Sequence, residues 1–283
     1  VYKRQAPSDP LRKVLIEIDG AAAEAVCAEP AIRAYKAAHF GQVEVTVCSR
    51  CCDLFRNHPA VGQMTSEMRF EEIEGFDARY CLGVLEACHA EGKHPVDAYA
   101  EQLGVTLCDR MPWLCLDSFD MVRTQRFSLE SLGHPRIAIA PGSDRMDKRW
   151  DAASWSRLCQ LLEDKLGASI LQIEPVEGAF LGHGLNLVGR LGPREAAAVL
   201  SGCDLLIAEE NGCLDLAAAV QTPLVAILNH VDPRLRMHPE GAAWVNSHPA
   251  PVAETCVESV LEAIVRLCQS SGEVKGMDES PES

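Results

Sequence analysis

Residues 136–150 read RIAIAPGSDRMDKRW, and residues 205–227 read LLIAEENGCLDLAAAVQTPLVAI. In both stretches a short apolar run ends at a glycine-containing turn, and a helical pattern follows. Such repeated alternation of strands and helices builds a doubly wound parallel sheet, with the carboxyl ends of its strands at one edge. We expect strands at residues 136–140, 169–173, 205–208 and 224–227, and helices at residues 152–166, 193–200 and 212–220.

The amino-terminal part of the chain shows the same alternation over a shorter length. Apolar runs at residues 13–18 (KVLIEI) and 43–48 (VEVTVC) flank a long helical pattern at residues 22–38, which predicts a parallel β-α-β unit. One further helix is predicted at residues 95–103. A helix at residues 254–268 would close the fold at the other end of the chain.

We therefore predict an α/β protein with two Rossmann-like, doubly wound domains that face each other across a cleft. The first would comprise residues 6–130 and the second residues 131–268, because the alternation restarts near residue 136. Residues 269–283 are polar and acidic, and we expect them to be disordered. Residues 1–5 (VYKRQ) look like a translated sequencing adaptor, and we exclude them from the fold.

The net charge and the hydropathy of the chain exclude some classes of function. The formal net charge of −15 repels polyanions, so nucleic acid is not an expected partner. No apolar run reaches the roughly 18 residues that a transmembrane helix requires. We therefore expect a chain without a transmembrane segment, whose anion-binding groups, if present, are arranged locally.

The cysteines indicate a reducing compartment. Their number, 13, is odd, the chain is long, and no signal segment opens it, so we interpret them as reduced thiols of a cytoplasmic protein. Cys48, Cys51 and Cys52 form a Cys-x-x-Cys-Cys cluster that is either half of a zinc site or a group of ordinary buried thiols. No second pair follows at suitable spacing, which favours the thiols.

The segment after the strand at residues 136–140 carries candidate anion-binding groups. Gly142 and Ser143 would allow main-chain amides to approach an anion, and Lys148 can place an ammonium group on a diphosphate. A basic, solvated loop would have the same composition. The segment alone therefore leaves both interpretations open.

The turn after the strand at residues 205–208 is a second candidate. The strand ends in two acids, Asn211 and Gly212 turn the chain, and the next helix would direct its free amides toward the edge of the sheet. An ordinary helix start capped by Asn211 would have the same sequence. This turn is therefore a weak signal when taken alone.

Together these segments resemble glycosyltransferase family 9, the bacterial heptosyltransferase family. The likeness covers residues 136–239 and recurs at residues 13–36, where the first strand, its loop and Pro30 align without a gap. It implies a glycosyltransferase of the GT-B type. The motifs occur in family order: Pro141-Gly142-Ser143, the run ending at Trp150, Asn186 to Arg190, Asn211-Gly212 through Thr222-Pro223, and Asp232-Pro233.

The resemblance assigns the catalytic carboxylate to Glu24, which stands where the family has an aspartate, with Ala23 in place of the preceding glycine. That carboxylate takes the proton of an acceptor hydroxyl as it attacks the anomeric carbon with inversion. Glu24 has a longer side chain, and a displacement of about 1 Å can reduce a rate on the order of a hundredfold. Asp19 is an alternative base, and Glu24 could instead simply be favoured by the helix dipole in a first turn.

The resemblance also implies a donor site. Lys148 matches the lysine that stabilises the departing nucleoside diphosphate, so neither a metal nor another cofactor is expected. Glu210 replaces an aspartate that touches the donor sugar, and Asp215 replaces a histidine. Asp215 would repel a diphosphate unless it points away or pairs with a base such as Arg149. The implied donor-binding residues are Gly142, Ser143, Arg149, Glu210, Asn211, Gly212, Cys213, Leu214 and Asp215.

The implied activity is hexosyl or heptosyl transfer from a nucleoside-diphosphate sugar, with ADP-heptose the favoured donor, to a saccharide or glycolipid acceptor of the cell envelope. Such an enzyme of lipopolysaccharide biosynthesis in a bacterium would act in the cytoplasm, in peripheral contact with the inner membrane. Residues 174–185 are too few for the family's extra helix beside the nucleobase, so the base does not follow. The substituted positions favour an alternative, a relative that binds a nucleotide sugar without transferring it. A sugar-nucleotide epimerase of similar architecture fits the order of the motifs less well.

Overall fold

The computed structural model describes residues 11–83, 88, 92–142, 149–174, 178–228, 232–236, 238, 242–246 and 255–271. The chain forms two compact units, Val1–Cys115 and Leu116–Ser283. The predicted boundary between residues 130 and 131 lies later in the chain, after α5 (Ser118–Thr124), η2 (Gln125–Phe127) and η3 (Leu129–Ser131). The predictions for residues 1–5, Ser143, Lys148 and the tail beyond residue 271 lie outside the described residues.

The first unit is built on a parallel sheet with the strand order β3-β2-β1-β4. Val14 pairs with Val45 on one side of β1 and with Ala78 on the other, so β1 is the buried central strand. The two predicted strands and both predicted helices are confirmed. The elements are β1 (Arg12–Ile18), α1 (Ala22–Ala38), β2 (Val43–Cys48), η1 (Cys52–Phe55), β3 (Gln63–Thr65), α2 (Phe70–Ile73), β4 (Ala78–Leu82) and α4 (Pro95–Leu103).

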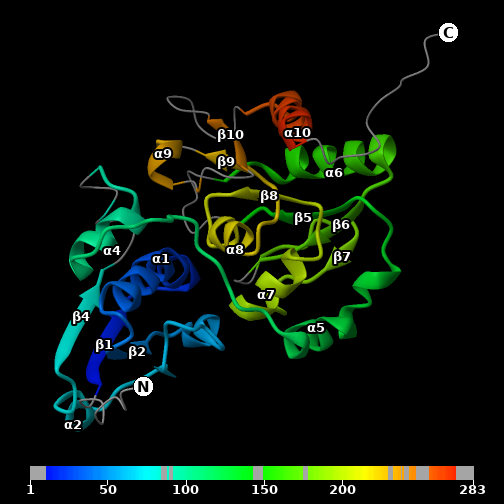
Figure 1. The fold of residues 1–283 in the computed structure, drawn as a ribbon. Coiled ribbons are helices and arrows are strands. Elements are labelled where there is room, and N and C mark those ends of the chain that lie inside the picture. The colour runs from blue at the N-terminus through cyan, green and yellow to red at the C-terminus, as the bar shows by residue number, and fades with distance from the viewer. Residues whose placement is uncertain are drawn as a thin grey trace, which may run out of the picture. The chain divides into compact units, whose positions relative to one another are not determined.

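Helices α1 and α4 lie side by side next to this sheet (Figure 1). The small residues of α1 allow close packing, and Ala25, Ala28 and Ile32 are fully buried. Helix α4 begins at His94, whose Nδ1 accepts a hydrogen bond of 3.2 Å from the Val96 amide. It ends at Gly104 in the left-handed conformation, with φ 66°. His94 is thus a capping residue.

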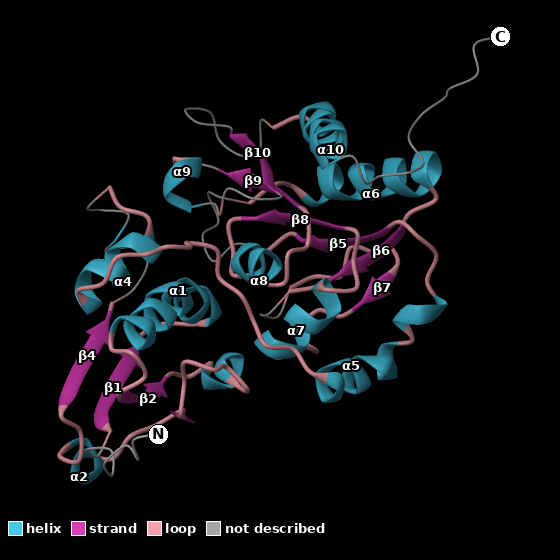
Figure 2. Cartoon of the chain, viewed as in Figure 1, coloured by secondary structure: helices cyan, strands magenta, loops and turns pink. Residues whose placement is uncertain are grey.

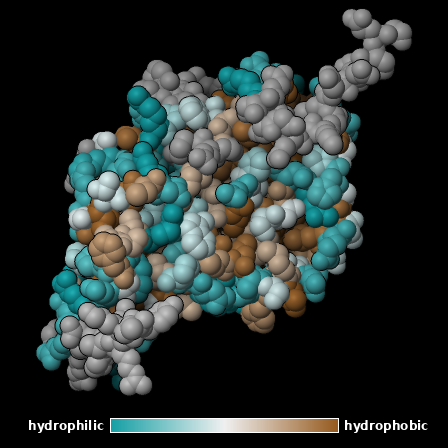
Figure 3. All heavy atoms as spheres, in the orientation of Figure 1, coloured by the Kyte–Doolittle hydropathy of each residue, from teal (hydrophilic) through white to brown (hydrophobic). Residues whose placement is uncertain are grey.

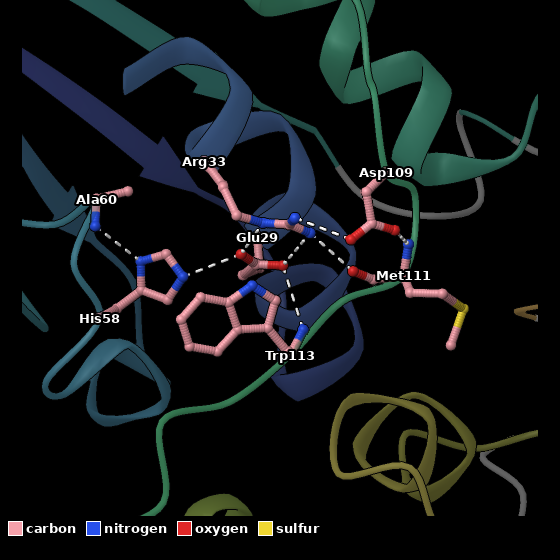
Figure 4. Close-up of polar contacts among 7 residues, drawn as sticks. All are labelled: Glu29, Arg33, His58, Ala60, Asp109, Met111 and Trp113. Atoms are coloured by element: carbon pink, nitrogen blue, oxygen red, sulfur yellow. Dashed lines mark hydrogen bonds and ion pairs between the residues drawn. The ribbon is translucent and has the colours of Figure 1, made fainter. Parts of the chain in front are cut away.

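Glu29 of α1 is a buried carboxylate that holds the segment near the end of this unit against the helix (Figure 4). It accepts hydrogen bonds from His58 Nε2 at 2.9 Å and from the Trp113 amide at 3.2 Å. Arg33 Nε donates to it at 2.9 Å, and Arg33 Nη2 donates to the Met111 carbonyl at 2.8 Å. Because His58 Nδ1 accepts from the Ala60 amide, the ring carries its proton on Nε2 and donates to Glu29.

The second unit contains a six-stranded sheet, all of whose neighbouring strands are parallel, in the order β10-β9-β8-β5-β6-β7. Strand β5 lies between β8 and β6, as a doubly wound sheet requires. All the predicted strands and helices of this unit are present. The elements are β5 (Arg136–Ala140), α6 (Ala152–Leu166), β6 (Ser169–Gln172), β7 (Leu185–Asn186), α7 (Pro193–Leu200), β8 (Leu205–Glu209), α8 (Cys213–Ala219), β9 (Leu224–Leu228), α9 (Pro233–Arg236), β10 (Ala242–Asn246) and α10 (Val257–Ser271).

Helices cover both faces of this sheet, with α6 and α10 on one side and α7 and α8 on the other (Figure 2). Trp155, Leu158 and Leu162 recur at helical spacing on α6 and are buried against Ile139 of β5 and Ile264 of α10. A buried ion pair joins α5 to α7, with Arg194 Nη2 2.8 Å from an Asp120 oxygen. Burial on both faces explains why these strands are almost entirely apolar.

The visible surface carries hydrophilic residues mixed with smaller apolar areas (Figure 3). On α5, Phe119 and Val122 are more than half exposed, at 58% and 56%. Single exposed apolar side chains of this kind are normal on protein surfaces. Within the described ranges, none of the helices combines the length and the apolar character that crossing a bilayer requires.

We predict that Glu29→Ala lowers the free energy of unfolding by about 3–5 kcal/mol, because it leaves buried donors of His58 and Trp113 without an acceptor. Urea unfolding followed by circular dichroism measures the change. Glu101→Ala is the control, since Glu101 pairs with Lys93 at the surface and its loss should cost about 0–1 kcal/mol. Equal losses in the two variants would show that the Glu29 network does not stabilise the unit.

Candidate functional site

The candidate base, Glu24, lies in the first turn of α1, just beyond the carboxyl end of β1. Its Oε2 accepts a hydrogen bond of 2.9 Å from the Ala21 amide, at the amino end of the helix. The residue is 8% exposed. This is the capping arrangement expected of an acid that the helix dipole favours. The sequence left this interpretation open, and catalysis by Glu24 stays a prediction.

A glycine makes room for the Glu24 side chain. Gly20 has φ 118°, and a Cβ atom added to it would lie 2.4 Å from Glu24 Cδ. Only glycine tolerates both this backbone conformation and this contact. The alternative base, Asp19, is exposed just after β1. Its amide donates to the Leu82 carbonyl at 3.1 Å.

The cysteine cluster lies near this loop. Burial raises the pKa of Cys51 to about 11, and Asp53, Cys52 and Glu24 add to the effect. Burial also raises the pKa values of Cys48 and Cys52. All three thiols are therefore protonated at neutral pH when they bind no metal.

In the second unit, Asn211 joins the carboxyl ends of β5 and β8. Its Nδ2 donates to the carbonyls of Ala140 at 3.0 Å and Gly142 at 2.6 Å. Its Oδ1 accepts from the Cys213 amide at 2.9 Å, at the start of α8. One side chain thus fixes both candidate turns against each other, because neighbouring strands of a parallel sheet end at the same edge.

Two of the amides that the sequence assigned to phosphate already have acceptors. The Cys213 amide donates to Asn211 Oδ1, and the Leu214 amide donates to the Asn211 carbonyl at 3.3 Å. Helix α8 starts at Cys213, with Gly212 as its cap, one residue later than predicted. Burial raises the pKa of the Cys213 thiol to about 12. A ligand at this turn would therefore meet a tightly hydrogen-bonded backbone.

Asp215 points into a buried ion-pair network. Arg236 donates to its two oxygens, each at 2.9 Å, and also reaches the Asn211 carbonyl at 2.9 Å. His238 Nε2 lies 3.4 Å from Asp215 Oδ1. Burial alone would raise the pKa of Asp215, but Arg236 and His238 outweigh it and lower the pKa to about 2. Asp215 therefore pairs with a base, as the sequence analysis allowed, and the base seen here is Arg236.

Two further acids at this edge, Glu174 and Glu209, were given no role in the site from the sequence. Glu174 follows β6, and burial raises its pKa. Its Oε2 would lie 3.1 Å from a Cβ atom at Gly142 and 1.7 Å from one at Gly178, so a side chain at residue 178 would require the Glu174 carboxylate to move. Glu209 ends β8 and is fully buried. The only sequence signal was that both residues follow apolar strands at their carboxyl ends.

Glu209 anchors the tryptophan that ends the Asp-Lys-Arg-Trp run. Its Oε1 accepts from the Trp150 amide at 2.7 Å and from the indole Nε1 of Trp155 at 2.9 Å. The indole of Trp150 donates to the Thr255 carbonyl at 2.8 Å, and the two rings meet edge to face at 5.3 Å. Residues on both sides of positions 143–148 are thereby fixed to the β8–α8 connection.

The structure thus gathers Gly142, Asn211 and Gly212 at one edge of the second sheet, where they are partly exposed. Glu210 is half-buried there and Arg149 is exposed. Arg149 lies near enough to Glu174 and Glu209 to lower the pKa of each, against the larger effect of burial. An exposed cation and a hydrogen-bonded turn at the strand ends can receive an anionic ligand.

Comparison with solved structures identifies the fold as that of heptosyltransferases. A family 9 glycosyltransferase of Veillonella parvula superposes with a TM-score of 0.78 at 14% identity, covering 94% of this chain and 100% of its own. The E. coli ADP-heptose lipopolysaccharide heptosyltransferase II gives 0.71 at 16% identity, with coverages of 92% and 99%. E. coli heptosyltransferase WaaC with ADP gives 0.66 at 16% identity, with coverages of 93% and 100%. At these identities the likeness establishes the fold alone.

The sequence itself establishes the family. Residues 93–247, more than half of the chain, match Glycosyltransferase family 9 (heptosyltransferase). No curated protein sequence matches the chain significantly. The chain therefore belongs to glycosyltransferase family 9, it has the GT-B type of fold that the sequence predicted, and its class of activity is glycosyl transfer.

We predict that Asp215→Asn lowers the free energy of unfolding at pH 7 by about 3–5 kcal/mol, because the buried Arg236 loses its charged partner. The pKa of Asp215 is lower in the folded state, so its contribution is complete above pH 4 and is lost as the pH falls through about 2. Urea unfolding at several pH values should show the two proteins converging in acid.

The control for that measurement is Asp164→Asn, since Asp164 is exposed on α6. This substitution should change the unfolding free energy by less than about 0.5 kcal/mol at any pH. An Asp215→Asn protein as stable as the parent at neutral pH would contradict the proposed role of the ion pair.

Proposed function

We propose that this chain transfers a heptose from an ADP-linked donor to a saccharide or glycolipid acceptor of the cell envelope, with inversion and without a metal ion. Family membership supports the class of reaction. The observation that carries the proposal for the site is the Asn211 bridge, which holds the ends of β5 and β8 together at the edge where α/β sheets bind nucleotides. Similar folds include an ADP-heptose heptosyltransferase and a heptosyltransferase bound to ADP.

In this proposal the acceptor hydroxyl loses its proton to Glu24 and attacks the anomeric carbon. The bond from that carbon to the phosphate oxygen breaks, and the nucleoside diphosphate leaves with the electron pair. Lys148 and Arg149 stabilise the negative charge on the leaving group. Gly142, Ser143 and the turn from Asn211 to Leu214 surround the phosphates, while Glu210 contacts the donor sugar.

The network around Asp215 removes an objection to this site. An unpaired carboxylate at the start of α8 would repel a diphosphate. Asp215 is fully buried and its charge is balanced by Arg236, so little of that charge reaches the edge of the sheet. We propose that the enzyme works in the cytoplasm of a bacterium, at the inner membrane surface where its acceptor would be available.

A second candidate function, donor binding without transfer, is favoured by one observation. Glu24 uses Oε2 as the cap of its own helix and is almost fully buried, which limits its access to an acceptor. The substitutions at Ala23, Glu24, Glu210 and Asp215 point in the same direction. Binding of a nucleotide sugar by the second unit would then be the whole function.

Glu24→Gln separates the two functions, because the amide keeps the size of the side chain but cannot take a proton. For the enzyme we expect turnover of ADP-heptose to fall roughly a hundredfold or more, with unchanged affinity for ADP. Lys148→Ala is the contrasting variant and should weaken ADP binding, since it removes a charge from the phosphates. Turnover is measured by ADP release and affinity by calorimetry.

The parent protein provides the decisive control for this comparison. ADP binding without measurable turnover in the parent, for any acceptor tested, would support the binding function. Full turnover in Glu24→Gln would contradict the role of Glu24 as the base.

A further inference from the structure

Glu209 connects elements that are far apart in the sequence. It is the last residue of β8, and its Oε1 accepts from the Trp150 amide at 2.7 Å and from Trp155 Nε1 at 2.9 Å. The amide belongs to the residue that leads into α6, and the indole belongs to α6 itself. A single oxygen atom therefore fixes the end of the segment after β5 to the end of β8.

The other oxygen of Glu209 is unusual. Among the described residues, Glu209 Oε2 is one of few buried side-chain atoms that have no hydrogen-bond partner. Burying an ionised carboxylate oxygen without a partner is costly, and such groups in folded proteins call for an explanation. Adding a proton to Oε2 would remove the buried charge while Oε1 continued to accept both hydrogen bonds.

Burial favours the protonated form of Glu209 against its charged surroundings, because Arg149 opposes protonation more than Glu174 favours it. Two charged groups affect the pKa of Glu209. Glu174, from the end of β6, raises it, and Arg149, which precedes Trp150, lowers it. Trp155 of α6 contributes only its indole hydrogen bond. Burial raises the pKa of Glu209 to about 7, Glu174 adds to the rise, and the two hydrogen bonds and Arg149 oppose it. This carboxyl group therefore changes its charge in the physiological range.

We propose that Glu209 is a positioning residue of the donor site that couples the binding of a nucleoside diphosphate to the uptake of one proton. Its Oε1 holds Trp150 in place, and protonation at Oε2 removes a negative charge two residues from Asn211, where the anion binds. This inference rests on the proposed function of that edge. It adds a role for a buried acid that neither donates to nor accepts from the reacting atoms.

Because proton binding and diphosphate binding are thermodynamically linked, the sign of the pH dependence of the affinity follows. A bound diphosphate adds negative charge near Glu209, which favours the protonated form and raises its pKa further. Affinity for the diphosphate must therefore fall as the pH rises through the range in which free Glu209 ionises. If binding raises the pKa by one unit, the loss is about tenfold.

Glu209→Gln provides the matched test, because the amide oxygen can accept both hydrogen bonds and the group stays neutral. ADP is titrated calorimetrically into the intact protein and into the variant between about pH 6 and about pH 8. The phosphate of ADP also ionises near this range, with a pKa of about 6, so the measured quantity is the ratio of the two affinities at each pH.

We expect the parent and Glu209→Gln to bind ADP about equally well near pH 6, and, for a rise of one unit, the parent to bind about fivefold more weakly near pH 8. Glu209→Ala removes the acceptor for Trp150 and should bind more weakly than Glu209→Gln at every pH. Glu258→Gln, on the exposed surface of α10, should follow the parent throughout. A ratio that does not change with pH, or full affinity in Glu209→Ala, would overturn the proposal.

Tryptophan fluorescence separates this inference from the proposed function. The indole of Trp155 contacts Glu209, so emission of the protein without ligand should titrate near neutral pH in the parent and not in Glu209→Gln. Absence of ADP binding in the parent, with this titration intact, would refute the proposed donor site and with it the coupling. ADP binding without the titration would refute the role of Glu209 alone.

Discussion

The side-chain amide of Asn211 supports the whole candidate donor site. By donating to the carbonyls of Ala140 and Gly142 it joins the ends of two neighbouring parallel strands, and its oxygen also accepts from the first amide of α8. Strand ends in a parallel sheet leave main-chain carbonyls without partners, and a buried or half-buried edge requires that they be satisfied. Here the group that satisfies them also sets the position of both turns that face a ligand.

A second constraint is the number of acids at this edge. A site for a diphosphate would ordinarily avoid carboxylates, yet Glu174, Glu209 and Asp215 lie close to the ends of the strands. Each is buried, and two different effects limit the charge that they carry. Arg236 balances the charge of Asp215, whereas burial holds the pKa values of Glu174 and Glu209 above their usual range. The net negative charge presented to an anion is therefore smaller than the sequence suggests.

The sequence predicted most of the regular structure because the signals are local. The bounds of α1, α4, α6 and α7 agree with prediction, since helical periodicity, Pro at the first turn and Gly after the last are all visible in the chain. Strands β3, β4, β7 and β10 and helices α2, α5 and α9 were not predicted, because each is too short to show a clear period. The contacts within the site were harder to predict. Pairs such as Trp150 with Glu209 and Asp215 with Arg236 join residues 59 and 21 positions apart, and they depend on which strands become neighbours.

The most direct test of this account is calorimetric titration of the intact chain with ADP-heptose and with the corresponding conjugates of UDP, GDP and CDP. A site at the ends of β5 and β8 predicts saturable binding of one sugar nucleotide per chain, ADP-heptose most tightly, and competition by ADP for the same site. Failure of every nucleotide sugar and every nucleoside diphosphate to bind would contradict the assignment of this edge as the donor site.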